Sequence, residues 1–358
     1  MMAEKKTAVV FGASGIIGRN VAERLAGSES WDVICVSKHA HADLPGSKAI
    51  ACDLTDAAAA ATALAAAKGA THVFICNWSR QANEKENCRV NALIVRNALE
   101  PLSATGNLRH AALVTGLKHY MGSFEDYATK PLETPFHEEM ERVPGDNFYY
   151  SQEDVLFEMA AEHGFNWSVA RPHTIIGYGP GAAMNMGTSL AIYATIARET
   201  GIPFVFPGSP QSWNGLVDMT DARLLAQHLE WEATEPKAAN MAFNVVNGDY
   251  FRWRNMWTRI ADYFGIPVAP YPGHEEPLQF RFHNIGGEWS KIVAKYGLRA
   301  EPIEKVAPWW HVDIDLLRTL ECVTDMGRSR KLGFLAYQNT WDAFVSLFER
   351  LRTEKIIP

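Results

Sequence analysis

Short runs of β-branched and other apolar residues alternate with longer segments of helical spacing through the first half of the chain. The short runs predict strands over residues 7–11, 32–36, 48–52, 71–76, 108–115 and 165–170. The longer segments predict helices over residues 19–25, 57–67 and 84–99. This alternation is typical of an α/β protein with a parallel sheet, in which ligands bind at the carboxyl ends of the strands.

The second half of the chain has a less regular pattern. We expect helices over residues 190–199, 220–231, 253–264, 315–326 and 341–351, and short strands over 204–206, 214–217 and 243–246. Residues 270–310, rich in Pro, Gly and aromatic side chains, are expected to cap a cleft. We therefore predict a first domain over residues 1–177 and, over 178–358, a mixed substrate-binding lobe and closing helices, some of which return to the first domain.

A glycine-rich loop follows the first predicted strand. Its sequence, GASGIIG, covers residues 12–18 and leads into the first helix. Glycines let the backbone approach a pyrophosphate, and the amino end of a helix favours its negative charge. At this position the motif predicts a dinucleotide site in a Rossmann-type doubly wound sheet.

Composition narrows the classes of partner. The 358 residues include 34 Lys and Arg against 41 Asp and Glu, a formal charge of −7 with no basic block, which argues against nucleic acid. The five cysteines lack paired ligand spacing, and we find no metal-binding motif. No apolar segment resembles a signal peptide or is long enough to span a membrane, so we expect a cytoplasmic enzyme. The oligomeric state stays open, with a homodimer as one candidate.

The second predicted strand ends in Ser37 and Lys38, where many such proteins carry an acid that binds the adenine ribose. A hydroxyl and a cation suit a 2′-phosphate, which favours NADPH over NADH, although Lys38 could equally be a solvated surface lysine. Asp53, after the third strand, could accept a hydrogen bond from the adenine amino group or simply begin a turn.

The stretch NFYYSQEDVLFE, residues 147–158, looks like a catalytic helix without its usual lysine. A lysine four residues after a tyrosine would lower the pKa of the phenol, but Asp154 stands at that spacing from Tyr150. Lys118 is the candidate to replace this cation. An ordinary amphipathic helix is the alternative.

Four motifs together resemble the progesterone 5β-reductase and iridoid synthase family, which consists of atypical extended short-chain dehydrogenases/reductases. They are GASGIIG, TGLKHYMGSF (115–124), NFYYSQEDVLFE and SVARPHTIIG (168–177). The resemblance implies NADPH-dependent reduction of a small apolar enone or enal, with Lys118 and Tyr150 as the catalytic residues. Tyr150 is preferred to Tyr149 because Glu158 then occupies the position of the glutamate in the extended pattern.

The predicted site follows from these motifs and from the strand ends. Around the cofactor we expect Gly12, Ser14, Gly15, Ile16, Ile17, Gly18, Ser37, Lys38, Asp53, Leu54, Asn77, Thr115, Lys118, Tyr150, Pro172, Thr174 and Ile175. Around the substrate we expect Trp78, Phe124, Tyr127, Met184 and Asn185. A carbonyl reductase, a sugar-nucleotide epimerase or dehydratase of the same fold, and a regulator that senses NADPH without turning it over are the alternative functions.

Overall fold

The computed structural model describes residues 5–39, 44–122, 132–180, 182 and 184–358. Seven parallel strands form its main sheet in the order β3-β2-β1-β4-β5-β6-β9, and β7 and β8 form a separate parallel pair. The strands are β1 (Lys6–Phe11), β2 (Trp31–Ser37), β3 (Ser47–Ala51), β4 (His72–Ile75), β5 (His110–Val114), β6 (Asn166–Pro172), β7 (Ile175–Ile176), β8 (Thr220–Asp221) and β9 (Met241–Val245).

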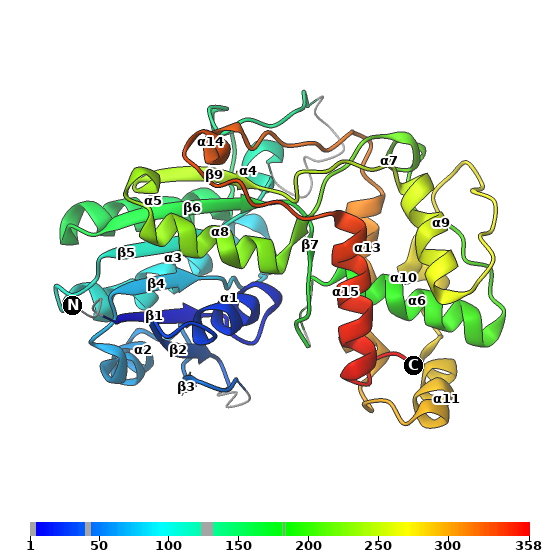
Figure 1. Cartoon of the computed structure of the whole chain (residues 1–358), viewed down its shortest axis with the longest axis horizontal. Coiled ribbons are helices and arrows are strands. Elements are labelled where there is room, and N and C mark those ends of the chain that lie inside the picture. Colours follow the sequence, from blue (N-terminus) through cyan, green and yellow to red (C-terminus); the bar gives the residue numbers. More distant parts are fainter. Residues whose placement is uncertain (1–4, 40–43, 123–131, 181, 183) are drawn as a thin grey trace.

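Helices connect these strands and build a second lobe beside the sheet (Figure 1). The helices of the first two thirds are α1 (Ile16–Ala26), α2 (Ala57–Leu64), η1 (Ala65–Ala67), α3 (Glu84–Ser103), α4 (Lys118–Met121), α5 (Phe148–His163), α6 (Met186–Thr200), α7 (Pro210–Asn214), α8 (Ala222–Thr234) and η3 (Pro236–Ala238). The remaining helices are α9 (Trp253–Phe264), α10 (Leu278–Arg281), α11 (Gly286–Tyr296), α12 (Ile303–Val306), α13 (Trp309–Leu316), α14 (Gly327–Lys331) and α15 (Thr340–Thr353).

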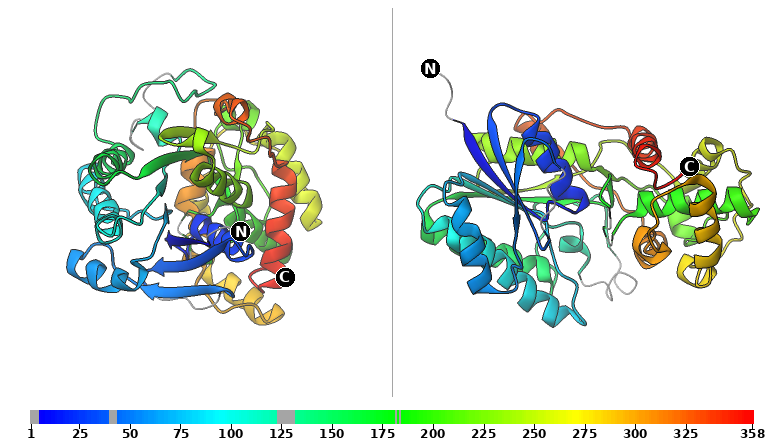
Figure 2. Two further views of the ribbon diagram at one scale, coloured as in Figure 1. Left: turned by 60° about the vertical axis from the view of Figure 1, so that its left-hand side comes forward. Right: turned by 90° about the horizontal axis from the view of Figure 1, so that it is seen from below.

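The main sheet is covered by helices on both faces, which explains why its central strands are continuous apolar runs. Helices α2, α3 and α5 pack on one face, and α1 and α8 on the other. Figure 2 shows these two layers on opposite sides of the sheet. The doubly wound parallel sheet predicted from the sequence is therefore confirmed.

The order of the strands changes direction between β1 and β4. From β1 the chain moves outward to β2 and β3, and then returns to pair β4 with the other edge of β1. At such a switch point the connecting loops diverge, and this leaves a crevice at the carboxyl ends of the strands. The glycine-rich loop after β1 and the loop after β4 lie at this crevice.

The second lobe has its own core. Helices α6, α9 and α15 contribute buried aromatic and aliphatic side chains to one cluster, in which Phe204 stacks on Trp257 with ring centroids 4.2 Å apart. After this lobe begins, the chain returns once to the main sheet, where β9 becomes the seventh strand beside β6. In the part of the chain that the structure describes, no helix is both long and apolar enough to cross a membrane.

Three sequence expectations differ from the structure. The strand expected over 214–217 is absent: α7 ends at Asn214, and Val217 makes only isolated bridges, to Phe251 and Cys322. The strand expected over 204–206 is reduced to one bridge between Phe204 and Val268. The helix expected over 315–326 is also wrong, because α13 stops at Leu316 and the following residues pair with distant segments.

Candidate functional site

The glycine-rich loop turns sharply into α1. Gly12 has φ +77°, a conformation that side chains other than glycine rarely adopt. A Cβ atom on Gly18 would lie 2.3 Å from the Gly12 carbonyl oxygen, so glycine is needed there for the helix to approach the loop. Gly15 caps α1 without any side-chain hydrogen bond, and the first turn contains no acidic residue. The amino end of α1 is thus suited to an anionic group such as a pyrophosphate.

The carboxyl ends of β2 and β3 carry an ion pair. Lys38 Nζ lies 2.9 Å from Asp53 Oδ2, and both side chains are exposed. The hydrogen bonds from Lys38 and from Thr55 lower the pKa of Asp53 to about 2. The Ser37 hydroxyl donates to the His39 carbonyl (2.6 Å), and the Leu54 carbonyl accepts from Asn97 (2.8 Å). These predicted residues form one edge of the crevice but do not line the cavity described next.

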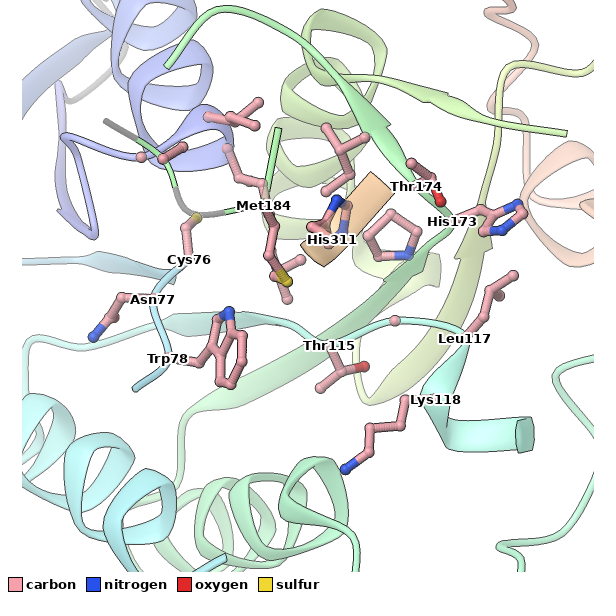
Figure 3. A pocket seen from close by; sticks show the side chains of 18 of the residues that line it. Cys76, Asn77, Trp78, Thr115, Leu117, Lys118, His173, Thr174, Met184 and His311 are labelled. Carbon is pink, nitrogen blue, oxygen red and sulfur yellow. The ribbon is translucent and has the colours of Figure 1, made fainter. Parts of the chain in front are cut away.

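A cavity of about 400 Å³, the central cavity, lies between the strand ends and the second lobe. Figure 3 shows Asn77, Trp78, Thr115 and Lys118 along its sheet side, with Met184 and His311 above them. The predicted residues that line it are Gly12, Ser14, Gly15, Ile16, Ile17, Asn77, Trp78, Thr115, Lys118, Pro172, Thr174, Ile175 and Met184.

The remaining predicted residues have other positions. Gly18 serves the packing of α1 on its loop, as described above. Asn185 is buried and its side chain caps α6 by accepting from the Thr188 amide (3.2 Å), so it does not line the central cavity. Phe124 and Tyr127 lie outside the described residues.

The two tyrosines at the start of α5 point to different places. Tyr149 lines the central cavity. Its hydroxyl oxygen lies 3.1 Å from the position that a Cβ atom on Gly116 would take, and the Pro172 carbonyl oxygen is also close to that position. Tyr150 does not line the cavity. Its hydroxyl donates to the His119 carbonyl (2.5 Å) and accepts from the Val143 amide (3.0 Å). Geometry thus favours Tyr149 over Tyr150 as the phenol that meets a ligand.

Helix α5 is placed by its capping residue. Asn147 Oδ1 accepts from the Tyr149 amide (3.1 Å), and Asn147 Nδ2 donates to the Lys118 carbonyl (2.9 Å). The same side chain therefore begins α5 and ties it to α4. This contact sets the distance between Tyr149 and Lys118.

Lys118 is almost fully buried and pairs with a carboxylate. Its ammonium forms an ion pair with Glu84, and the side chains of the two residues are only 2% and 12% exposed. It also lies 4.5 Å from the centre of the Phe148 ring. In Figure 3 its side chain runs from the cavity wall toward the helices below the sheet edge.

Neither tyrosine has a lysine one helical turn later. Glu153 follows Tyr149 at that spacing, and its carboxylate accepts from Arg142 (2.9 Å) and Arg171 (3.4 Å). Burial raises the pKa of the Tyr149 phenol, and the negative charge of Glu84 raises it further. The phenol is therefore held in its neutral form, which can donate a hydrogen bond.

The second lobe supplies a polar wall that the sequence did not indicate. Arg318 forms an ion pair with Asp315, and Asp315 Oδ2 accepts from the Thr174 hydroxyl (2.6 Å). His173, which follows β6 in the first domain, meets this wall, and its Nδ1 lies 2.8 Å from Asp218 Oδ1. Burial lowers the pKa of His311, which lines the same wall and is neutral as a result.

Two residues that line the cavity make a contact between the lobes. The Arg80 guanidinium lies 4.2 Å from the centre of the Trp310 ring, and both residues line the cavity. Trp310 belongs to the segment expected to cap a cleft. Since no motif marks the residues that follow it, a pattern of residues could not have identified His311, Asp315 or Arg318 as cavity residues.

A nicotinamide dinucleotide fits the donor set of the crevice. The amino end of α1 offers backbone amides, and the buried Asn77 Oδ1 has no hydrogen-bond partner among the described residues. Pro172, Thr174 and Ile175 offer a turn at the opposite end of the cavity. Within the same described residues no group of His, Cys, Asp and Glu side chains could hold a metal ion.

The chain is similar to proteins of one family. Residues 53–358 match the model of the PRISE-like Rossmann-fold domain. The chain is 37% identical to the (S)-8-oxocitronellyl enol synthase of Nepeta racemosa over 99% of its own length and 94% of that protein. It is 35% identical to the 3-oxo-Delta(4,5)-steroid 5-beta-reductase of Arabidopsis thaliana, with the same coverage.

Solved structures of lower identity share the fold. A UDP-glucose 4-epimerase of Thermotoga maritima is 12% identical, with a TM-score of 0.69 over 97% of this chain and 99% of that one. A putative epimerase of Burkholderia cenocepacia is 18% identical, with a TM-score of 0.67 over 98% of both chains. The resemblance drawn from the four motifs is confirmed, and the chain belongs to the progesterone 5β-reductase and iridoid synthase family of extended short-chain dehydrogenases/reductases.

Proposed function

We propose that this protein is an NADPH-dependent reductase of α,β-unsaturated carbonyl compounds. The observation that carries the proposal is the position of Tyr149: its phenol lies at the cavity wall beside Gly116 and Pro172, without a lysine one turn later on α5. Relatives of similar length include a steroid 5-beta-reductase, whose name describes reduction of such a compound.

The proposed chemistry uses few groups of the chain. A bound nicotinamide would supply a hydride to the β-carbon of the substrate. Tyr149 donates a hydrogen bond to the carbonyl oxygen and stabilises the enolate charge that develops there as the C=C electrons move toward oxygen. Water then protonates the α-carbon, so the chain needs no strong acid at the oxygen. Trp78, Met184 and Leu117 give the cavity apolar surface for the carbon skeleton.

Carbonyl reduction is the second candidate, because one observation favours it. The Thr115 hydroxyl lines the same cavity and could assist protonation of an alkoxide. It lies 3.4 Å from the Ala170 carbonyl, a weak contact that leaves it able to turn toward a ligand.

Product analysis separates the two reactions. With NADPH and 2-cyclohexenone we expect cyclohexanone as the product. When cyclohexanone replaces the enone as the substrate, we expect hardly any consumption of NADPH. Formation of the allylic alcohol as the main product would contradict the proposal and favour carbonyl reduction.

The preference for NADPH is a separate part of the proposal. A 2′-phosphate at the ends of β2 and β3 would meet Lys38, whose present partner is Asp53. Lys38→Asp would place two acids there. It should lower the ratio of kcat/KM for NADPH to kcat/KM for NADH by about 10- to 100-fold, because that factor corresponds to the free energy of one charge-assisted hydrogen bond. Lys48→Asp, an exposed lysine at the amino end of β3, is the matched control. An unchanged ratio in Lys38→Asp would rule this role out.

A further inference from the structure

Glu84 joins its own helix, α3, to the two elements that carry Lys118 and Tyr149. It is the first residue of α3. Its Oε1 atom accepts from the Lys118 ammonium of α4 and from the Phe148 amide at the start of α5, the latter at 2.9 Å. Its Oε2 atom accepts from Asn87 Nδ2 at 3.0 Å. One carboxylate therefore fixes Lys118 and the residue that precedes Tyr149.

The ion pair also determines the charge around Tyr149. A lysine alone beside a phenol favours the phenolate, because the positive charge stabilises the negative one. Here Lys118 is buried and the Glu84 side chain is only 12% exposed, so solvent screens them little and their charges cancel at close range. The neutral pair leaves Tyr149 protonated.

Other titratable groups surround this pair and must be considered. Cys88 on α3 is close to both members of the pair, and burial raises the pKa of its thiol, so it is neutral. Asp146 lies just before α5. Arg80, His173, His311, Asp315 and Arg318 line the cavity with Tyr149, Arg80 from the loop after β4, His173 from the end of β6 and the others from the second lobe. After burial, the negative charge of Glu84 raises the pKa of the Tyr149 phenol, and this opposes the effect that Lys118 would have alone.

We propose that Glu84 is a positioning residue that holds Lys118 in place and cancels its charge, so that Tyr149 acts as a neutral hydrogen-bond donor to the substrate oxygen. This inference rests on the proposed function, since a neutral phenol is what the reduction of an enone requires. In enzymes with a lysine one turn after the tyrosine, the cation is used to favour the phenolate. In this chain Glu84 cancels the charge of Lys118, so the neutral phenol is favoured instead of the phenolate.

The test is the titration of the Tyr149 phenol in four proteins without substrate. Tyrosinate absorbance is recorded against pH for the native protein, Glu84→Gln, Lys118→Met and the double variant. Each is paired with its Tyr149→Phe derivative, whose curve is subtracted because the chain contains 11 tyrosines. The midpoint should be lowest in Glu84→Gln, by about one pH unit or more relative to the native protein. Lys118→Met should have the highest midpoint, and the double variant should lie between the two single variants.

Failure of this inference can be told apart from failure of the proposed function. The titration needs no enzymatic turnover, whereas the product analysis needs no Glu84 variant. A Glu84→Gln protein that keeps its circular dichroism and shows an unchanged or raised midpoint would overturn the inference. If Glu84→Gln alone does not fold, the double variant, which carries no buried charge of the pair, replaces it. Its midpoint must then lie below that of Lys118→Met, and equal midpoints would overturn the inference.

Activity against pH gives a second readout. In Glu84→Gln the alkaline decline of kcat/KM for 2-cyclohexenone should begin about one pH unit or more lower than in the native protein, because the phenol loses its proton earlier. Glu84→Asp keeps the charge and should restore most of the native profile. A role of Glu84 in folding alone would lower activity at every pH without moving this decline.

Discussion

At the scale of single residues, the site depends on which of two adjacent tyrosines faces the ligand. Tyr149 and Tyr150 both lie in the first turn of α5 and differ by one step of the helix, which turns their side chains in different directions. The hydroxyl of Tyr149 has no hydrogen bond to any described residue, whereas that of Tyr150 has two. The sequence could not make this choice, because it depends on how Glu84 and Asn147 orient the start of the helix.

A matched pair of variants tests this assignment. Tyr149→Phe should lower kcat/KM for an enone by about 10²- to 10⁴-fold and leave the fold intact, because it removes only the donor to the substrate oxygen. Tyr150→Phe should keep activity within about tenfold of native but lower the free energy of unfolding by about 1–3 kcal/mol, since a buried carbonyl and an amide lose their partner. Steady-state kinetics and denaturant titration of both variants give the comparison. The reverse pattern would return the catalytic role to Tyr150.

At the scale of elements, the local signals predicted the first half of the chain better than the second. The succession of β1, the glycine-rich loop and α1 was predicted correctly, because neighbouring residues specify each of these elements. Helix α7 was not predicted, although the sequence contains a signal for its start: Ser209 caps the helix and Pro210 occupies its first turn. The end of α13 carries no such signal. Beyond it, Cys322 and Thr324 pair with Val217 and Phe136, and these distant contacts outweigh the helical spacing of 315–326.

The predicted site shows the same division. Residues at strand ends and in the glycine loop were found because a parallel sheet brings them together wherever the rest of the chain lies. The wall built from α13 was not found, since its residues reach the cavity only through packing of the second lobe. Glu84 was read as the start of a helix, and its contact with Lys118 spans 34 residues of sequence.

At the scale of the whole molecule, the two lobes are joined by an ion pair whose residues do not line the cavity. Arg350 on α15 donates to both carboxylate oxygens of Glu23 on α1, at 2.9 and 2.7 Å. Burial alone would raise the pKa of Glu23, but hydrogen bonds and charges from Arg350 and Arg19 lower it below its ordinary value of 4.5. A bidentate pair of this kind is stronger than an ordinary surface ion pair.

Glu23→Gln should therefore reduce stability in a way that depends on pH. A carboxyl group with a lowered pKa in the folded state adds stability above its unfolded pKa and loses it as the pH falls through the folded value. We expect a loss of about 1 kcal/mol at pH 7, modest because the side chain is 27% exposed. The difference should shrink as the pH falls below 4.5. Urea titrations from pH 3 to 7 measure it, with the exposed Glu29→Gln as control, and a difference that does not vary with pH would contradict the account.

The destination of the hydride tests the central claim most directly. NADPH deuterated at both C4 positions is incubated with 2-cyclohexenone and the native protein, and the product is analysed by nuclear magnetic resonance. The account predicts cyclohexanone with deuterium on the carbon that was β to the carbonyl. Deuterium on the carbon that bears oxygen, in an allylic alcohol, would contradict it.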